Sequence, residues 1–180
     1  SRLMGIPTLI STSTASGASA VTISSGIDST YDEYMFVFTD IAPGTDNKKL
    51  QWQVNGVDES GFNETITSTS WQAYHEEADG SNLAYDASFE QAQGTSYSNV
   101  SYAIGSDSDE SGAGVMHLFN PASTTYVKHF YSRFSNYGYT PQMTDLFMAG
   151  YINTTTAIDE ISFKMDSGNF DGVIQLYGIA

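Results

Sequence analysis

Three histidines, His75, His117 and His129, are the first residues in this 180-residue chain whose chemistry suggests a reactive site. A serine hydrolase needs a histidine and an acid beside a nucleophile on a strained turn, and the sequence contains no G-x-S-x-G motif. No H-x-H or H-E-x-x-H spacing occurs that would favour a zinc site. His117 and His129 fall in alternating segments typical of strands, where hydrogen-bonded structural histidines are common. We therefore expect them to be structural.

The densest acidic cluster lies in Gly105–Gly112, which carries Asp107, Asp109 and Glu110. Alternate carboxylates in a tight loop are able to converge on a hard cation such as Ca²⁺. Counted from Asp107, the segment has the sixth-position glycine, Gly112, but it lacks the further Asp or Asn and the distal Glu of an EF-hand loop. We interpret it as a solvated hairpin loop, with a calcium site as the alternative. No metal and no other cofactor is predicted.

Carboxylates elsewhere are candidates for hydrolysis of a glycosidic bond, which uses two carboxyl groups facing each other across a cleft. They are Glu64, Glu76, Asp86 and Glu90. Their separation in space does not follow from the sequence. We predict that the protein is not an enzyme, and a polysaccharide hydrolase stays an alternative.

Aromatic residues crowd the stretch from Tyr126 to Tyr139. Rings that alternate along a strand occupy both of its faces, so some of them are exposed. Exposed rings stack on the apolar side of a sugar, while amides and carboxylates bind its hydroxyl groups. A glycan-binding face is therefore predicted at Tyr126, Tyr131, Tyr137 and Tyr139. The alternative is that such rings fill the core of a sandwich.

The segments that must position these residues alternate between polar and apolar residues with a period of two, which is the pattern of half-buried strands. The clearest pair is Ile158–Asp166 and Val173–Ile179, which flank the turn residues Ser167, Gly168 and Asn169. Further strands are expected in Ala20–Ser24, Tyr34–Phe38, Leu50–Asn55, Tyr97–Ile104, Val115–Phe119, Thr125–Asn136 and Asp145–Ile152.

This pattern predicts an all-β fold, an antiparallel β-sandwich of the jelly-roll type with about eight to ten strands. Ser70–Ala78 is the best candidate for a short helix, and it fits a strand ending at the turn Asp79-Gly80 equally well. We expect an N-terminal arm and first edge segment in residues 1–19 and a single sandwich domain in residues 20–180.

The N-terminal arm is apolar and carries no carboxylate. Its residues are Arg2, Leu3, Met4, Ile6 and Leu9. Burial of such side chains contributes about 0.8 kcal/mol per methylene without desolvating a carboxylate. We expect the arm to dock on a neighbouring subunit, with coverage of its own domain edge as the alternative. The segment lacks the apolar core and cleavage site of a secretory signal, so no signal peptide is expected.

The balance of charge narrows the range of partners. The chain has 6 Lys and Arg against 21 Asp and Glu, a formal net charge of −15. Phosphate backbones and anionic lipid head groups repel such a chain, so neither nucleic acid nor membrane insertion is expected. Its longest apolar runs are far shorter than the ~20 residues of a membrane helix. The absence of cysteine excludes disulfides and thiolate metal sites.

Two groups of segments carry a family resemblance. The first is Ile27–Tyr34, Phe36–Pro43 and Leu50–Val54, and the second is Phe119–Ala122, Thr124–Phe130, Ala157–Phe163 and Gly172–Ile179. Together they resemble the small virion structural proteins of tailed bacteriophages. The resemblance covers roughly the whole chain after residue 20 and implies a jelly-roll module assembled on a virion. Its motifs belong to the scaffold and carry over no catalytic or ligand residue.

We therefore predict a non-enzymatic bacteriophage structural protein, either a capsid decoration or cement protein or a tail-associated module. It would be made in the host cytoplasm and work on the virion surface. Its expected partners are capsid or tail subunits and further copies of itself as a homotrimer, because flat-sided modules pack around symmetry axes. The alternative is a receptor-binding or carbohydrate-binding adhesin on the same fold, with a host surface glycan as partner.

Overall fold

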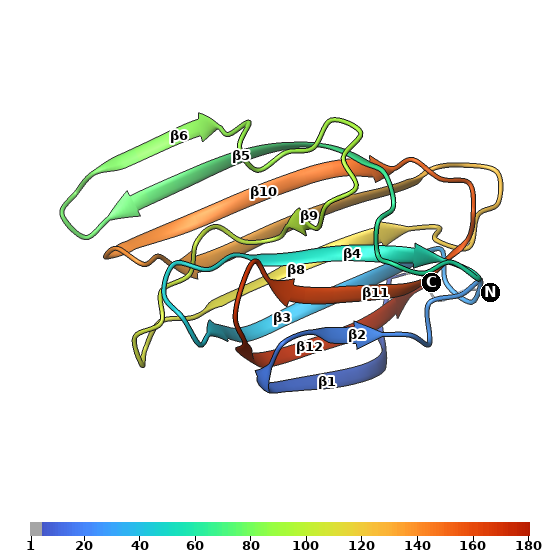
Figure 1. The fold of residues 1–180 in the computed structure, drawn as a ribbon, viewed down its shortest axis with the longest axis horizontal. Coiled ribbons are helices and arrows are strands. Elements are labelled where there is room, and N and C mark those ends of the chain that lie inside the picture. The colour runs from blue at the N-terminus through green and yellow to red at the C-terminus, as the bar shows by residue number, and fades with distance from the viewer. Residues whose placement is uncertain (1–4) are drawn as a thin grey trace.

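The computed structural model describes residues 5–180 and consists of twelve β-strands (Figure 1). They are β1 (Thr8–Ala18), β2 (Val21–Ile23), β3 (Glu33–Pro43), β4 (Leu50–Gly56), β5 (Ile66–Glu76), β6 (Ser81–Tyr85), β7 (Ser98–Asn99), β8 (Gly112–Phe119), β9 (Lys128–Tyr137), β10 (Gln142–Ile152), β11 (Ile158–Met165) and β12 (Phe170–Ile179). Within residues 5–180 no helix is long and apolar enough to cross a membrane.

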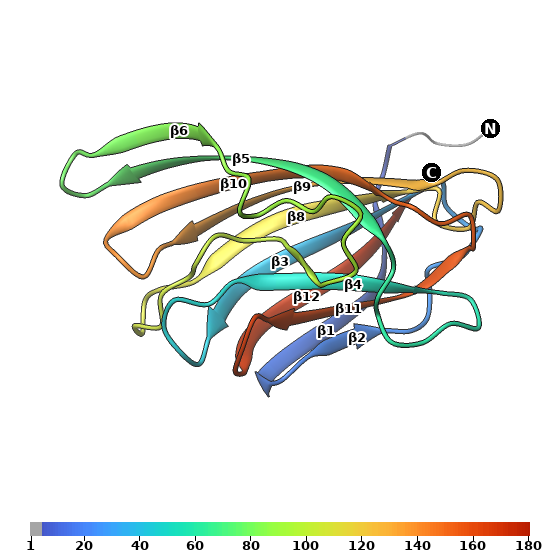
Figure 2. The same ribbon diagram turned by 45° about the horizontal axis from the view of Figure 1, so that its top comes forward.

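The strands form two antiparallel sheets packed face to face, which confirms the predicted β-sandwich. The large sheet has the order β1-β12-β3-β8-β9-β10-β5-β6, and the small sheet has the order β2-β11-β4-β7. Figures 1 and 2 show the small sheet over the part of the large sheet that contains β12, β3 and β8, whereas the β5–β6 hairpin extends beyond it. The sandwich is therefore asymmetric.

The number of strands exceeds the eight to ten expected because the edges of the large sheet gave weak signals. Thr8–Ala18 and Ser81–Tyr85 form the two edge strands, and both are rich in polar or small residues without a clear alternation. Ser70–Ala78 is not a helix, because most of it lies in β5. There Ser68 and Ser70 are buried while Thr69 and Trp71 are exposed, which is the period of a strand.

The jelly-roll form of the sandwich stays a prediction. The connections from β3 to β4 and from β11 to β12 each cross between the sheets, and the crossing strands pair as β3 with β12 and β4 with β11. In contrast, β8, β9 and β10 follow one another as a meander within the large sheet. In all, eight of the eleven connections between consecutive strands of residues 5–180 cross between the sheets, and the other three stay within the large sheet.

The core between the sheets is built around aromatic contacts. Phe163 on β11 packs edge-on against Phe36 and Phe38 on β3, with ring centroids 5.4 and 5.2 Å apart. Trp52 on β4 meets Phe130 on β9 in the same way at 4.7 Å. All five side chains are almost completely buried. These contacts hold the small sheet in place on the large one.

Beyond the small sheet, the two segments that flank β7 cover the inner face of the large sheet. Phe89 lies between β6 and β7, Tyr102 lies between β7 and β8, and their rings stack at 5.2 Å. Phe89 packs in a second buried cluster with Leu146 and Met148 of β10. The inner face of the sheet is therefore covered by two different elements, and its other face is turned to solvent.

The described part of the predicted N-terminal arm, from Gly5 onward, lies at the β1 edge of the large sheet. Arg2, Leu3 and Met4 lie outside the described residues. Ile6 and Leu9 are 66% and 51% exposed, and Leu9 already belongs to β1, which pairs with β12. These two side chains leave apolar surface in solvent instead of covering the edge of the domain. The first edge segment is thus a strand of the same sandwich.

We expect Phe163→Ala to lower the free energy of unfolding by about 3–5 kcal/mol, because the substitution leaves a cavity between the two sheets. Urea denaturation followed by circular dichroism measures this change. Val57→Ala is the control, since Val57 is 42% exposed and its truncation costs about 0.5 kcal/mol or less. Equal effects of the two substitutions would contradict the described core.

Candidate binding face

The solvent-facing side of the large sheet, here called the outer face, is the best candidate for a functional site. The antiparallel register aligns one row of outward side chains across all eight strands. In order, this row is Tyr85, Trp71, Phe147, Arg133, Val115, Val37, Gln175 and Thr12. Aromatic rings therefore stand where an exposed sheet face usually carries polar residues.

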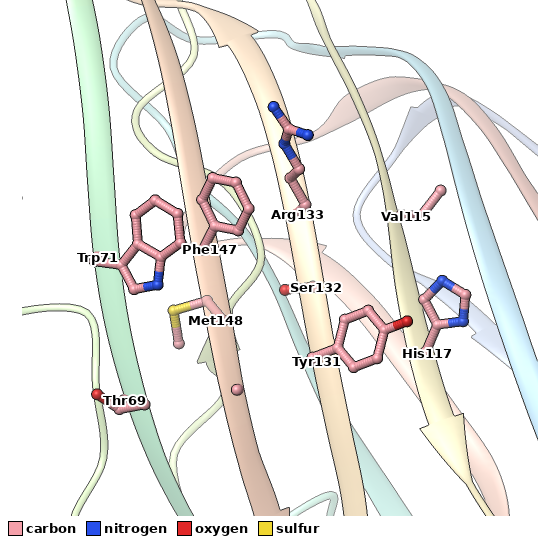
Figure 3. A pocket seen from close by; sticks show the side chains of 10 residues that line it. Thr69, Trp71, Val115, His117, Tyr131, Ser132, Arg133, Phe147 and Met148 are labelled. Carbon is pink, nitrogen blue, oxygen red and sulfur yellow. The ribbon is translucent and has the colours of Figure 1, made fainter. Parts of the chain in front are cut away.

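Trp71 and Phe147 form the first ring pair on this face (Figure 3). Their rings are stacked with centroids 3.7 Å apart and an angle of 9° between the planes. The guanidinium of Arg133 lies 4.8 Å from the centre of the Phe147 ring and forms a bidentate ion pair with Asp145 at 2.7–3.2 Å. This ion pair fixes a long side chain in one orientation.

His117 and Tyr131 form the second ring pair, with centroids 4.7 Å apart and 24° between the planes. Nδ1 of His117 is hydrogen-bonded to Oε1 of Glu33 at 2.5 Å. Phe119 packs against Tyr131 at 5.6 Å. The interpretation of His117 as a hydrogen-bonded histidine within a strand agrees with these contacts. His75 and His129 are exposed on other parts of the same face.

A hollow of about 530 Å³ lies among the two ring pairs, and we call it the central hollow. Thr69 and Ala149, paired across β5 and β10, are its smallest outward side chains. Figure 3 shows the rings of Trp71, Phe147 and Tyr131 around this space. The hollow exists because small side chains stand beside large ones in neighbouring rows. Its volume falls in the range of about 300–1,000 Å³ that is usual for small-molecule sites.

The outer face carries few charges for a chain with a net charge of −15. Asp145 is the sole carboxylate in β8, β9 and β10. It is paired with Arg133, and Glu33 on the neighbouring β3 is paired with His117. A ligand or partner can therefore approach this face without placing an unpaired carboxylate in a dry contact.

The structure divides the predicted glycan residues. Tyr131 belongs to the second ring pair, and Tyr137 lies on the same side of β9, where its hydroxyl donates to Oε1 of Glu77 at 2.9 Å. Tyr126 and Tyr139 lie in the segments before and after β9, outside the row of rings. Sequence reasoning gathered residues that are close in the chain, whereas the face gathers residues from different strands.

Trp71 and Phe147 are rings of the face that sequence reasoning did not assign to a site, and His117 was expected to be structural. A usable signal was present in β5, where alternation places Trp71 on the same side as Thr69. Its pairing with Phe147 depends on the register between β5 and β10, which the sequence alone does not reveal.

The acidic loop is folded onto itself. The side chain of Glu110 turns back and accepts a hydrogen bond from the backbone N–H of Asp107 at 2.8 Å. The N–H of Glu110 donates to the carbonyl of Asp107 at 3.0 Å. In the part of the chain that the structure describes, no group of three or more acidic or histidine side chains is arranged to hold a metal ion. Asp109 adds a third carboxylate to this turn. The loop joins β7 of the small sheet to β8 of the large sheet, so it is not a hairpin loop, and the calcium interpretation stays a prediction.

Among the carboxylates considered for hydrolysis, Glu90 and Asp86 accept hydrogen bonds from neighbouring side chains. Glu90 accepts a hydrogen bond from the hydroxyl of Tyr85. Asp86 accepts from Gln72 at 2.8 Å and from Ser88 at 2.6 Å. Glu76 is half-buried at the end of β5, beside the turn that leads to β6.

Glu64 is the fourth candidate, and its environment is unusual. Burial, together with a hydrogen bond and charge repulsion from Glu59, raises the pKa of Glu64 to about 7. The attraction of Lys128 opposes this shift. Lys128 itself is completely buried, donates to the carbonyl of Thr154 at 3.1 Å and has a pKa lowered by burial. The proximity of Glu59 and the burial of Glu64 thus favour the protonated form of the Glu64 carboxyl group.

Comparisons of the chain with protein-family models, with curated proteins and with solved structures found no match. The resemblance to bacteriophage virion proteins therefore stays a prediction. The function has to be argued from the outer face and from the placement of the N-terminal edge.

We expect the thermal stability of the protein to fall as the pH rises from 4.5 to about 7, in part because of Glu64. Its folded-state pKa lies above its ordinary value, so the stabilisation is full below pH 4.5 and is lost as the pH rises through 7. Glu64→Gln removes this contribution, so the melting temperature of the variant should decline less steeply across that interval.

Asp46→Asn is the matched control, because it removes one exposed carboxylate and should leave the slope of the wild type unchanged. Scanning calorimetry at several pH values measures all three proteins. If Glu64→Gln follows the slope of the wild type, the raised pKa is wrong.

Proposed function

We propose that the chain is a non-enzymatic surface module of a bacteriophage particle, a capsid decoration or tail-associated protein that acts by binding. The observation that carries this proposal is the outer face, where exposed rings and paired charges stand on one rigid antiparallel sheet. Rigid rings offer contact area at low entropic cost, which suits binding. The resemblance to virion proteins supports the assignment to a particle.

The N-terminal edge is the proposed attachment side. Ile6 and Leu9 are exposed beside β1, whose free edge leaves backbone groups available for pairing. Attachment there would bury apolar surface and leave the outer face open. The proposed site of action is the virion surface, and synthesis in the host cytoplasm follows from that assignment. The strong negative charge supports a position away from packaged DNA.

Deleting residues 1–7, which precede β1, should leave a folded protein that no longer occupies the particle. The expected reason is the loss of the apolar contact made by the arm. Mass spectrometry of purified particles that carry the deletion measures occupancy, and an unchanged cooperative melt of the isolated variant shows that the fold is intact. Occupancy equal to that of the wild type would place the anchor elsewhere, and absence of the intact chain from particles would refute the proposed function.

A homotrimer is the proposed assembly, because flat-sided modules pack around symmetry axes. Because each chain carries a charge of −15, subunits repel one another at low ionic strength. Added salt screens this repulsion, so the trimer should become tighter as the concentration of sodium chloride rises. Light scattering across a salt series at micromolar protein measures the mass of the assembly. A monodisperse monomer at physiological salt would contradict the proposal.

A further inference from the structure

Each ring pair leaves one ring face uncovered. Phe147 stacks on one face of Trp71, so the other face of Trp71 is turned toward β6. A second hollow of about 320 Å³ lies there, lined by Trp71, Leu83, Ala84 and Tyr85, and we call it the edge hollow. Trp71 therefore stands between two hollows with its free face in the edge hollow.

The second ring pair has a similar arrangement. His117 covers one side of Tyr131, and Ala149 lies opposite Tyr131 on the other side across β10. The central hollow adjoins this small residue, so the uncovered face of Tyr131 is accessible from the hollow (Figure 3). The outer face thus offers two separate aromatic platforms, Trp71 and Tyr131, on neighbouring rows of one sheet.

We propose that the outer face binds a neutral carbohydrate chain, with one sugar ring stacked on Trp71 and another on Tyr131. This inference rests on the proposed function in taking the outer face as the binding surface. The C–H groups on one side of a pyranose pack against an aromatic ring, while its hydroxyl groups point sideways to polar partners. Two platforms require a chain longer than one sugar.

Polar partners for the hydroxyl groups stand beside the platforms. The guanidinium of Arg133 uses its Nε and one terminal nitrogen to bind Asp145, which leaves its other terminal nitrogen as a donor. Arg133 is 62% exposed, so this group is accessible from solvent. The Tyr131 hydroxyl and the ring of His117 complete the set around the central hollow. Fixed donors next to rings are what a sugar requires.

The charges on this face favour a neutral ligand over an anionic one. Arg133 and His117 are each already paired with a carboxylate, so neither offers an uncompensated positive charge to a sulfate or uronate. The net charge of −15 also repels an anionic polymer at long range. A second copy of the chain carries the same net charge of −15, and this repulsion opposes self-association at low ionic strength.

A glycan array printed with neutral and anionic oligosaccharides, probed with the isolated full chain, tests the proposal. We expect binding to a neutral oligosaccharide. Binding to its constituent monosaccharide and to anionic glycans should be weaker or absent. Calorimetric titration with the neutral oligosaccharide found on the array should then show a loss of affinity of about tenfold or more in Trp71→Ala and in Tyr131→Ala.

Two further variants serve as a control and as an independent test of the central hollow. Tyr126→Ala removes a ring that is 70% exposed outside the outer face, and its affinity should equal that of the wild type. Ala149→Phe keeps every ring of the two pairs and fills the floor of the central hollow, so it should also lose affinity. Each variant is used only if its thermal melt remains cooperative.

Several outcomes would overturn the inference. They are an array without any neutral hit, an affinity unaffected by both Trp71→Ala and Ala149→Phe, or a self-association of the wild type that these two substitutions abolish. These outcomes leave the proposed virion function standing, because that function is tested by occupancy on particles. Conversely, if the chain were absent from phage particles, a measured affinity for a glycan would still support the inference.

Discussion

The register of the large antiparallel sheet is the constraint on which the rest of the structure depends. Side chains alternate between the two faces of a strand, so a slip of one residue in β10 would turn Phe147 inward and expose Leu146 and Met148. The buried cluster around Phe89 and the contacts of Phe163 with β3 hold the inner side chains in place. The core therefore fixes which rings stand on the outer face.

The two faces of the large sheet have different roles: the inner face packs in the core, and the outer face is the proposed binding surface. The four strands of the small sheet and the segments that flank β7 cover the inner face of the eight-stranded sheet, and the aromatic contacts between the sheets lie on that side. The rings of the outer face contact one another instead of the core, as Trp71 does with Phe147. Backbone pairing on both sides of each central strand fixes the sheet, and the side chains of its outer face are turned to solvent. This division explains how one chain combines a dry core with an exposed aromatic row.

Local patterns predicted much of the fold, and long-range pairing accounts for what was missed. The alternation in Tyr34–Phe38 and the turn after Met165 are visible in the sequence, so strands there and the sandwich class were predictable. The edge strands were missed because polar and small residues dominate them. Of the predicted glycan residues, Tyr131 belongs to a ring pair and Tyr126 does not. The ring partners of Tyr131 lie on β8, far from it in the sequence, so closeness along the chain could not identify them. The raised pKa of Glu64 likewise depends on Glu59 and Lys128, which only the fold brings to it.

The central claim is that the outer face is open in solution, and the two tryptophans report on it directly. Trp71 is 42% exposed on the outer face, while Trp52 is completely buried between the sheets. Fluorine NMR of the chain labelled with 5-fluorotryptophan gives one resonance for each, assigned by Trp71→Phe, and a soluble gadolinium chelate broadens only the resonances that it can approach. The account predicts strong broadening of Trp71 and little broadening of Trp52. Equal protection of both resonances in the wild-type chain would show that the outer face is covered, and would contradict its role as the binding surface.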